Sequence, residues 1–288
     1  MLRDARRSFG LSGLLMLVLL SRASAQSIPD MRSVCSRGLS NATVAFGTAG
    51  VLDANPALSQ IDREHMSVVT AGFIPNVAGL EHSDELLGTL ALRTNVSELV
   101  ASLGFARYHY SDLFGDQTVA IGVSRVFAVD SLRSASAGVR ARYVRMSFGG
   151  AAPDLSQLLV DAGMRFAISP QFAIGASAEN LLGATHDVID GTREAYARMF
   201  IGGAAYHAAD ADVTLGAEVE AIVNEHSRLR FGIEDRLEQF LVLRAGAATD
   251  PSEFSGGVGF RFHAFSLDAA AQYSSLVTVL SLEIGWQW

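Results

Sequence analysis

The stretch Leu276–Trp288, LVTVLSLEIGWQW, decides the fold of this chain. One set of alternate residues is apolar except for Thr278, and the other set includes Ser281, Glu283 and Gln287. A repeat of two residues is typical of a β-strand, because successive side chains point to opposite faces. A strand with one apolar face, one polar face and aromatic residues at its end favours a barrel embedded in lipid. The last strand of a soluble β-sandwich would show the same alternation and is the alternative.

The first 25 residues have the features of an export signal. Three arginines within the first seven residues precede a short apolar core at 11–20. That core is shorter than the roughly 20 residues that a membrane-spanning helix needs. Ala23–Ala25 matches a signal-peptidase site, so we expect a signal peptide over 1–25 and a mature chain that begins at Gln26.

The composition favours an exported barrel over a soluble enzyme. Hydrophobic residues make up 49% of the chain and charged residues 18%, against roughly 25% charged residues in ordinary soluble domains. No uninterrupted apolar span follows the leader, which argues against a helical membrane protein. The formal net charge is -8 and every basic residue is arginine, which argues against binding to nucleic acid. The single cysteine, Cys35, excludes an internal disulfide and lies too far past the cleavage site for a lipoprotein anchor.

The same alternation recurs along the chain and predicts about fourteen strands, with twelve as the alternative count. The predicted strands lie near 64–73, 85–93, 98–110, 117–127, 135–146, 157–168, 171–179, 194–206, 211–222, 227–235, 238–248, 253–262, 264–273 and 276–288. Many have the 9–11 residues that a tilted strand needs to cross a bilayer. The sequence therefore predicts an all-β fold, a transmembrane antiparallel up-and-down β-barrel over 63–288. A short N-terminal segment at 26–62 precedes it, as a luminal plug or a periplasmic turn.

The two faces of these strands differ in a way that suits lipid outside and water inside. The polar face mixes Gly, Ala and Ser with one or two charges, and a lipid-embedded barrel turns such a face toward its lumen. We expect the lumen to be lined by Arg140, Arg142, Asp161, Arg165, Glu179, Glu218, Glu220, Arg228, Arg230, Glu234, Arg244, Arg261, Asp268 and Glu283. Aromatic residues near strand ends suit the two interfacial girdles of a bilayer: Tyr108, Tyr110, Phe127, Tyr143, Phe172, Tyr206, Phe240, Tyr273 and Trp288. The hairpin that turns at 224–225 would set Glu218 and Glu220 opposite Arg228 and Arg230.

Several segments, in their order along the chain, resemble a known family of barrels. They are Asp53–Ala57, Asp161–Gly163, Glu179–Gly183, Glu234–Leu237, Leu243–Gly246, Asp250–Pro251, Phe254–Phe260 and Phe265–Asp268. Together they resemble the outer-membrane barrels related to the PorV and PorQ proteins of type IX secretion, which are distantly similar to FadL-type transporters. The resemblance covers about 45–288 and implies a fourteen-stranded barrel. It also implies a role in transport or in carrying cargo to the cell surface.

Neither the motifs nor the histidines indicate catalysis. The seven histidines lie near predicted strand ends or loops without metal-ligand spacing, and no G-x-S-x-G motif occurs. His186, Asp187 and Asp190 are interpreted as a solvated acidic loop rather than a cation site or a catalytic cluster. We therefore predict a protein that is not an enzyme, with no catalytic residue, no metal and no cofactor.

The predicted function is that of a porin-like channel or transporter for a small or hydrophobic solute in the outer membrane of a Gram-negative cell. The alternative is a non-catalytic interaction barrel of a secretion or surface-attachment system. The expected partners are outer-membrane lipid, the barrel-assembly machinery through the C-terminal strand, and secretion-system proteins, with no nucleic acid. The expected loops are short, the longest being near 74–84, 147–157 and 181–193, so a narrow lumen is expected. Asn55, Pro56 and Ala57 would form the turn of a luminal plug or a plain periplasmic turn.

Overall fold

A computed structural model describes residues 32–46, 55–58, 67–75, 83–93, 99–110, 114–130, 132–147, 154–182, 185–188, 192–195, 198–223, 227–274 and 278–288. The expected signal peptide and the expected cleavage before Gln26 lie outside these residues. In the described ranges, no helix is long and apolar enough to cross a membrane.

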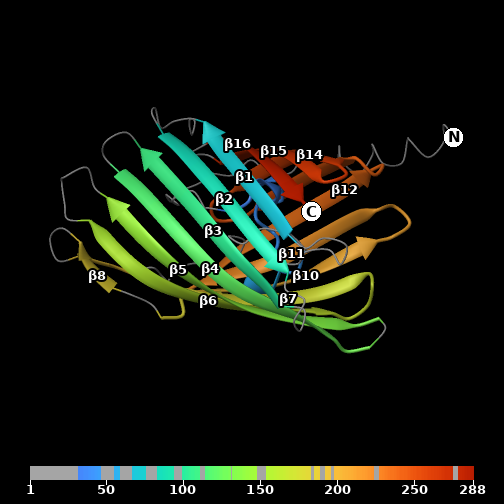
Figure 1. The fold of residues 1–288 in the computed structure, drawn as a ribbon, viewed down its shortest axis with the longest axis horizontal. Coiled ribbons are helices and arrows are strands. Elements are labelled where there is room, and N and C mark those ends of the chain that lie inside the picture. Colours follow the sequence, from blue (N-terminus) through green and yellow to red (C-terminus); the bar gives the residue numbers. More distant parts are fainter. Residues whose placement is uncertain are drawn as a thin grey trace.

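Fourteen of the strands in the described chain form one closed antiparallel barrel (Figure 1). They are β1 (Ser67–Pro75), β2 (Ser83–Arg93), β3 (Leu99–Tyr110), β4 (Phe114–Ala128), β5 (Ser134–Ser147), β6 (Leu155–Ala167), β7 (Phe172–Glu179), β10 (Met199–Ala208), β11 (Val213–Ile222), β12 (Ser227–Leu237), β13 (Leu241–Ala248), β14 (Glu253–Phe262), β15 (Phe265–Ser274) and β16 (Thr278–Gln287). Each strand pairs with the next along the barrel, and β7 pairs with β10. The predicted fold and the count of fourteen are confirmed, and the alternative count of twelve is wrong.

The barrel closes where the first strand meets the last. β1 pairs antiparallel with β16, with Val68 opposite Gln287. The backbone N–H of Ser67 donates to the carbonyl of Trp288 at 3.1 Å, and the N–H of Trp288 donates back at 3.2 Å. The strand near the end of the sequence is therefore what seals the sheet and removes its free edges.

One stretch that was expected to be a loop contains two further strands. β8 (Thr185–Val188) and β9 (Thr192–Ala195) pair with each other as a separate two-stranded sheet, between β7 and β10 in the sequence. The expected loop near 181–193 therefore connects two barrel strands and carries a short hairpin that the sequence analysis did not predict. A strand of four residues gives too short a run for alternation to reveal it.

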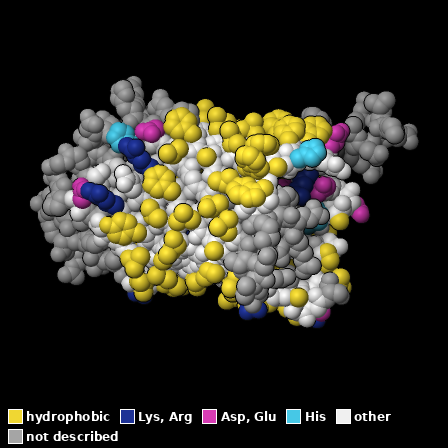
Figure 2. All heavy atoms as spheres, in the orientation of Figure 1, with side chains coloured by type: hydrophobic (Ala, Val, Ile, Leu, Met, Phe, Trp, Pro, Cys, Tyr) yellow, Lys and Arg dark blue, Asp and Glu magenta, His cyan; other side chains and the backbone are white. Residues whose placement is uncertain are grey.

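Apolar side chains cover the outside of the barrel, and small and polar side chains point inward. Ile121 and Ile284 are 60% and 59% exposed, whereas Asp161 is fully buried. In Figure 2 the hydrophobic side chains spread over the middle of the visible face, and charged side chains gather toward its two ends. Seven of the expected girdle residues have exposed side chains, but Tyr108 is only 5% exposed. Its assignment to a lipid girdle is wrong because the register places it beside Glu85 and Asp116 on the inner face.

The described part of the N-terminal segment lies inside the barrel. α2 (Val34–Gly38) contacts β13 to β16, whereas the 3-10 helix η2 (Pro56–Leu58) contacts β4 to β6. Because β5 and β14 are half the circumference apart in the strand order, these two helices lie against opposite walls. Figure 1 shows the blue ribbon of this segment within the barrel. We call residues 32–46 and 55–58 the plug.

Candidate functional site: the luminal plug and its ion-pair network

All fourteen residues that were expected to line the lumen lie on inward-facing positions of β5 to β7 and β11 to β16. Ten of them are buried and four, Arg142, Arg165, Arg228 and Arg261, are half-buried. Unpaired charges are costly inside a protein, so each buried carboxylate needs a cation or several hydrogen-bond donors. The structure brings twelve of these side chains together in three clusters, which we call the luminal ion-pair network. The other two, Arg165 and Glu283, contact the plug backbone instead, and Nε of Arg165 donates to the carbonyl of Ala45 at 3.0 Å.

The first cluster lies on β5, β6 and the end of β7. Asp161 accepts from Nε of Arg140 at 2.8 Å and from Nε of Arg142 at 2.7 Å. The backbone N–H of Asn180 donates to its other oxygen at 3.0 Å. Arg142 also donates to Oδ1 of Asn180 at 2.7 Å and lies 3.9 Å from Glu179. A fully buried carboxylate is thus satisfied by two guanidinium groups and one peptide N–H.

The second cluster joins β11 and β12. The register sets Glu218 opposite Arg230 and Glu220 opposite Arg228, as the sequence predicted. Nη2 of Arg230 donates to Oε2 of Glu220 at 2.8 Å, and Nε of Arg230 lies 3.8 Å from Oε1 of Glu218. Arg228 lies 3.7 Å from Glu220. The two strands therefore carry a charge-balanced patch on their inner face.

The third cluster spans β12 to β15. Arg244 donates to Glu234 at 2.9 Å and to Asp268 at 2.6 Å. Arg261 donates to both oxygens of Asp268, at 2.9 and 3.0 Å. Such charge-assisted contacts are roughly twice as strong as neutral ones. This cluster lies on the part of the inner wall that α2 contacts.

The same charged side chains also hold the backbone of the plug. Glu218 accepts from the N–H of Val44 at 2.9 Å, and Arg230 donates to the carbonyl of Ser40 at 3.0 Å. Glu283 accepts from the N–H of Val34 at 3.3 Å. The wall charges therefore act as plug ligands as well as partners for each other.

The plug in turn supplies charges and hydroxyls that the wall binds. Nη2 of Arg37 donates to both oxygens of the fully buried Glu85 on β2, at 2.8 and 3.0 Å. Nη2 of Arg32 lies 3.8 Å from Glu220. The hydroxyls of Ser40 and Ser255 are 2.9 Å apart. These contacts tie α2 and the residues on either side of it to β2, β11 and β14.

The Asn55–Ala57 turn lies inside the barrel against β6. Nδ2 of Asn55 donates to the carbonyl of Val44 at 2.8 Å and to that of Met164 at 2.9 Å. Its Oδ1 accepts from the N–H of Ala57 at 3.0 Å, a local turn that short polar side chains favour. Asn55 therefore links the two described parts of the plug and fastens both to the wall.

Glycines on the inner wall make room for the plug. A Cβ at any of five glycines would collide with a plug residue, because backbone, amide or ring atoms of the plug lie directly against the strand. The pairs are Gly138 with Pro56, Gly163 with Asn55, Gly175 with Val44, Gly216 with Phe46, and Gly246 with Leu39. Glycine within a strand often marks such a close approach of another backbone. The small residues of the polar faces are thus explained by the plug rather than by an open channel.

Apolar packing also holds the plug against the barrel wall. Leu39, Val44, Ala45 and Phe46 of the plug form a buried cluster with β10, where Ile201 belongs to the same cluster. Buried apolar area of this kind contributes about 25 cal/mol per Å². The plug is consequently held by both charge and apolar packing across the width of the lumen.

Some site residues were absent from the predicted set. Arg32 and Arg37 lie in a segment without alternation, so no pattern showed where their charges would go. Glu85 was detectable, because it is the one carboxylate in its phase of β2, which also includes Leu87, Thr89 and Ala91. The signal would have been an acidic side chain in phase with the buried Leu87 and Thr89. Leu86 and Leu92, which are in the opposite phase, are exposed.

The region considered for catalysis offers no assembled site in the described residues. His186 and Asp187 lie on β8, and Asp190 falls outside the described residues. In the described part of the chain, no group of three His, Cys, Asp or Glu side chains could hold a metal ion. Burial raises the pKa of the Cys35 thiol above its usual range, so this thiol stays protonated at neutral pH.

No family model and no curated protein matches the sequence. Solved structures of similar fold do exist. The CymD monoaromatic hydrocarbon channel superposes with a TM-score of 0.65 at 12% identity, over 92% of this chain and 99% of that one. The toluene transporter TbuX of Ralstonia pickettii gives a TM-score of 0.60 at 12% identity, over 88% and 96% of the two chains. A FadL homologue of Pseudomonas aeruginosa gives 0.61 at 13% identity, over 91% and 99%.

These structures share their fold with this chain. They are named as a monoaromatic hydrocarbon channel, a toluene transporter and a FadL homologue. The comparisons therefore support a FadL-like fold. They contain no support for the resemblance to the PorV and PorQ proteins.

Proposed function

We propose that this protein is an outer-membrane channel for a small hydrophobic solute, gated by the plug. The observation that carries the proposal is a closed fourteen-stranded barrel whose lumen is crossed by its own N-terminal segment. Its fold matches, over nearly the whole chain, structures named as a monoaromatic hydrocarbon channel and a toluene transporter. Those names supply the solute class, an apolar molecule of the size of one aromatic ring.

The way in which the plug is held supports a gate. The described contacts between plug and wall are made by side chains, such as Arg37 with Glu85 and Glu218 with the N–H of Val44. Each such bond contributes a net of about 0.5–3 kcal/mol. The plug can therefore leave its seat while every strand pair of the wall remains intact.

A reversible lock tests the gate. The hydroxyls of Ser40 on the plug and Ser255 on β14 are 2.9 Å apart, so cysteines placed there can form a disulfide. The variant is Ser40→Cys with Ser255→Cys in a Cys35→Ser background, and Cys35→Ser alone is the matched control. The measurement is uptake of radiolabelled toluene by cells that carry the barrel, before and after a reductant.

We expect the oxidised double variant to lose the uptake that the barrel confers, and reduction to restore it. The control should take up toluene equally under both conditions. Uptake that the lock leaves unchanged would contradict the gate. Uptake equal to that of cells without the barrel, in every variant, would contradict the channel itself.

A second function has one observation in its favour. A lumen that is crossed by a plug and lined by paired charges suits a barrel that does not conduct but binds other proteins at the cell surface. In that case a secretion or surface-attachment partner should copurify with the barrel from membranes, and the Ser40–Ser255 lock should not release it. The barrel-assembly machinery, reached through β16, remains a predicted partner.

The localisation follows the same proposal. The apolar outer surface and the shared fold support the outer membrane, and we propose that the signal peptide over 1–25 directs the export. A heat-modifiable band in the outer-membrane fraction tests this, and a soluble periplasmic chain would contradict it.

A further inference from the structure

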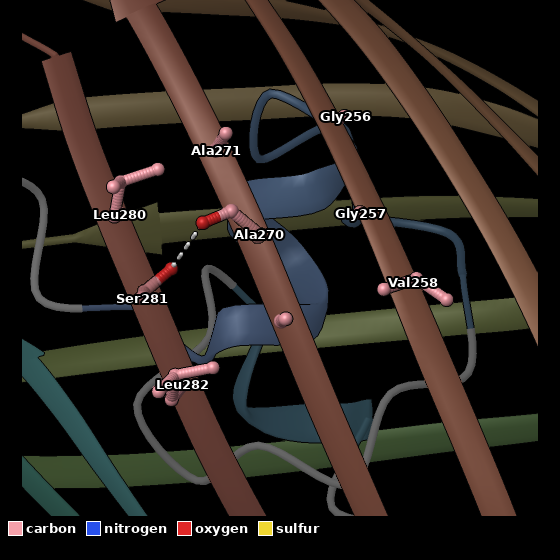
Figure 3. A pocket seen from close by; sticks show the side chains of 9 residues that line it. Gly256, Gly257, Val258, Ala270, Ala271, Leu280, Ser281 and Leu282 are labelled. Carbon is pink, nitrogen blue, oxygen red and sulfur yellow. Dashed lines mark hydrogen bonds between the residues drawn. The ribbon is translucent and has the colours of Figure 1, made fainter.

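The wall formed by β14, β15 and β16 has a hollow that faces outward. Three residues from each strand line a cavity of about 490 Å³. This volume lies within the range of about 300–1,000 Å³ that small-molecule sites occupy. Figure 3 shows the hollow between the three strands, with α2 behind them inside the barrel. We call it the outer hollow, and its lining residues are Gly256, Gly257, Val258, Ala269, Ala270, Ala271, Leu280, Ser281 and Leu282.

Register and exposure show which lining residues face outward. Gly256 pairs with Ala271, which pairs with the exposed Leu280. The next outward row consists of Val258, Ala269 and the exposed Leu282. Small side chains on β14 and β15 therefore lie beside large ones on β16, which leaves a depression in the apolar surface.

The plug does not account for the small outward residues. On the inner face, a Cβ at Gly257 would lie 3.2 Å from the carbonyl oxygen of Ala269 and 3.3 Å from Cα of Gly38 in α2, both closer than an ordinary van der Waals contact. On the outer face, a Cβ at Gly256 would have as its nearest neighbour the carbonyl oxygen of Arg244, at 3.8 Å. Larger side chains would therefore fit at the outward positions, and the hollow is not a by-product of seating α2.

The lining restricts the chemistry of what can occupy the hollow. Its one polar side chain, Ser281, donates its hydroxyl to the carbonyl of Ala270 at 3.3 Å. The other side chains are apolar, so the lining suits a ligand without hydrogen-bonding groups.

The size of the hollow distinguishes between apolar occupants. Three neighbouring strands span about 10 Å, and three residues along a strand span about 7 Å. An α-helix with its side chains is about 10–12 Å across, so a helix does not fit. A second barrel would need about 20–30 residues on each side for a stable interface, and nine residues line the hollow. Non-bonded carbon atoms pack about 3.5–4.0 Å apart, so a single hydrocarbon chain fits.

We propose that the outer hollow binds one acyl chain of a membrane lipid. This rests on the membrane placement given under the proposed function. The hollow lies in the part of the wall that faces the bilayer core, where acyl chains are the surrounding medium. A chain seated among Val258, Leu280 and Leu282 gains dispersion contacts that it lacks against a flat wall.

Photo-crosslinking with a lipid tests the site. The probe is a phosphatidylethanolamine that carries a diazirine halfway along one acyl chain, mixed into vesicles that contain the full-length barrel. After irradiation, digestion and mass spectrometry show which strands carry the label. We expect label on β14 to β16 in excess over the outward faces of β7, β10 and β11.

Matched glycine variants identify the hollow as the cause. Gly256→Leu fills the hollow, and Ala271→Leu fills it from the neighbouring strand. Gly202→Leu adds the same side chain at an outward glycine of β10, where a Cβ would have no neighbour within 4 Å. We expect both filling variants to lose the excess label and Gly202→Leu to keep it. Heat-modifiability shows that each variant forms the barrel.

Three results would overturn the proposal. They are equal labelling of all outward strands in the wild type, an excess that survives in both filling variants, and cross-links from the lining residues to a second barrel. Equal labelling of a heat-modifiable barrel leaves the membrane placement intact and removes only the lipid site. Absence of label together with absence of heat-modifiability would remove the placement too.

Discussion

Replacing Phe231 by arginine tests which face of the barrel meets lipid. Phe231 lies on β12 (Ser227–Leu237), pairs with Ala217 and Ala247, and is 48% exposed on the outer face. A strand rises about 3.4 Å per residue, which becomes about 2.6 Å along the bilayer normal at a tilt of about 40°. Phe231 is then about 10 Å from one end of its strand and about 16 Å from the other.

That depth places the side chain within the apolar band of a barrel, which is about 25 Å tall. Phe231→Arg should therefore lower the free energy of unfolding by about 2–4 kcal/mol, the cost of an arginine near the midplane. Phe262→Arg, at the last residue of β14, should cost about 0–1 kcal/mol because it lies at the interface. The assay is urea-induced unfolding in lipid vesicles, followed by the loss of heat-modifiability.

The inner face provides the control. Glu218→Ser on β11 removes a plug ligand but places no charge in lipid, so the barrel should still form. The reasoning would be refuted if Phe231→Arg were as stable as the wild type while Glu218→Ser failed to fold. Inside and outside would then be exchanged.

The remaining predictions concern the plug, the network and one turn. Gly246→Val should displace the plug, because its side chain meets the backbone at Leu39, while the barrel remains heat-modifiable; Gly202→Val should leave the plug seated. Maleimide labelling measures this displacement, since Cys35 is the single cysteine and lies half-buried on α2 inside the barrel; labelling of the wild type as fast as that of Gly246→Val would contradict the expected displacement. Asp161→Asn should cost about 3–5 kcal/mol in unfolding free energy, because it leaves two arginines in the lumen without their carboxylate; a urea midpoint equal to that of the wild type would show that the cluster is dispensable. A side-chain hydrogen bond from Arg133 lowers the pKa of Asp130 in the folded protein. The stability that the Asp130 carboxylate contributes is therefore present above the ordinary pKa of about 3.9 and is lost as the pH falls through the lower folded pKa. A carbon-13 titration that places the pKa of Asp130 at or above the ordinary value would refute this.

The sequence was sufficient to predict the wall of the barrel, because each strand of the wall shows its own alternation of apolar and polar side chains. Each spanning strand is eight or more residues long, so an alternation of apolar and polar side chains is visible without knowledge of the neighbours. The pairing of Glu218 with Arg230 followed from a short hairpin, where the turn fixes the register. The fourteen-strand count followed for the same reason.

The plug and its ligands were harder to predict from the sequence, since they depend on contacts between distant residues. Arg37 and Glu85 are 48 positions apart, and no periodicity connects them. Tyr108 looked like a girdle residue because it lies near a strand end, but its phase along β3 matches Ala106 and Ser102, which face inward. Phase along the strand was the better guide, and proximity to the strand end was misleading.

The pairing of β1 with β16 has a consequence for how the protein folds. Ser67 and Trp288 are 221 positions apart, and the chain entropy lost in bringing two ends together grows as about (3/2)RT ln n. Joining them costs roughly 3.5 kcal/mol more than closing a four-residue hairpin. We expect this seam to form late, after the hairpins between neighbouring strands, and to form around the N-terminal segment that the lumen encloses. Until then the sheet has two open edges, so the nascent protein is most exposed to aggregation just before its last strand is in place.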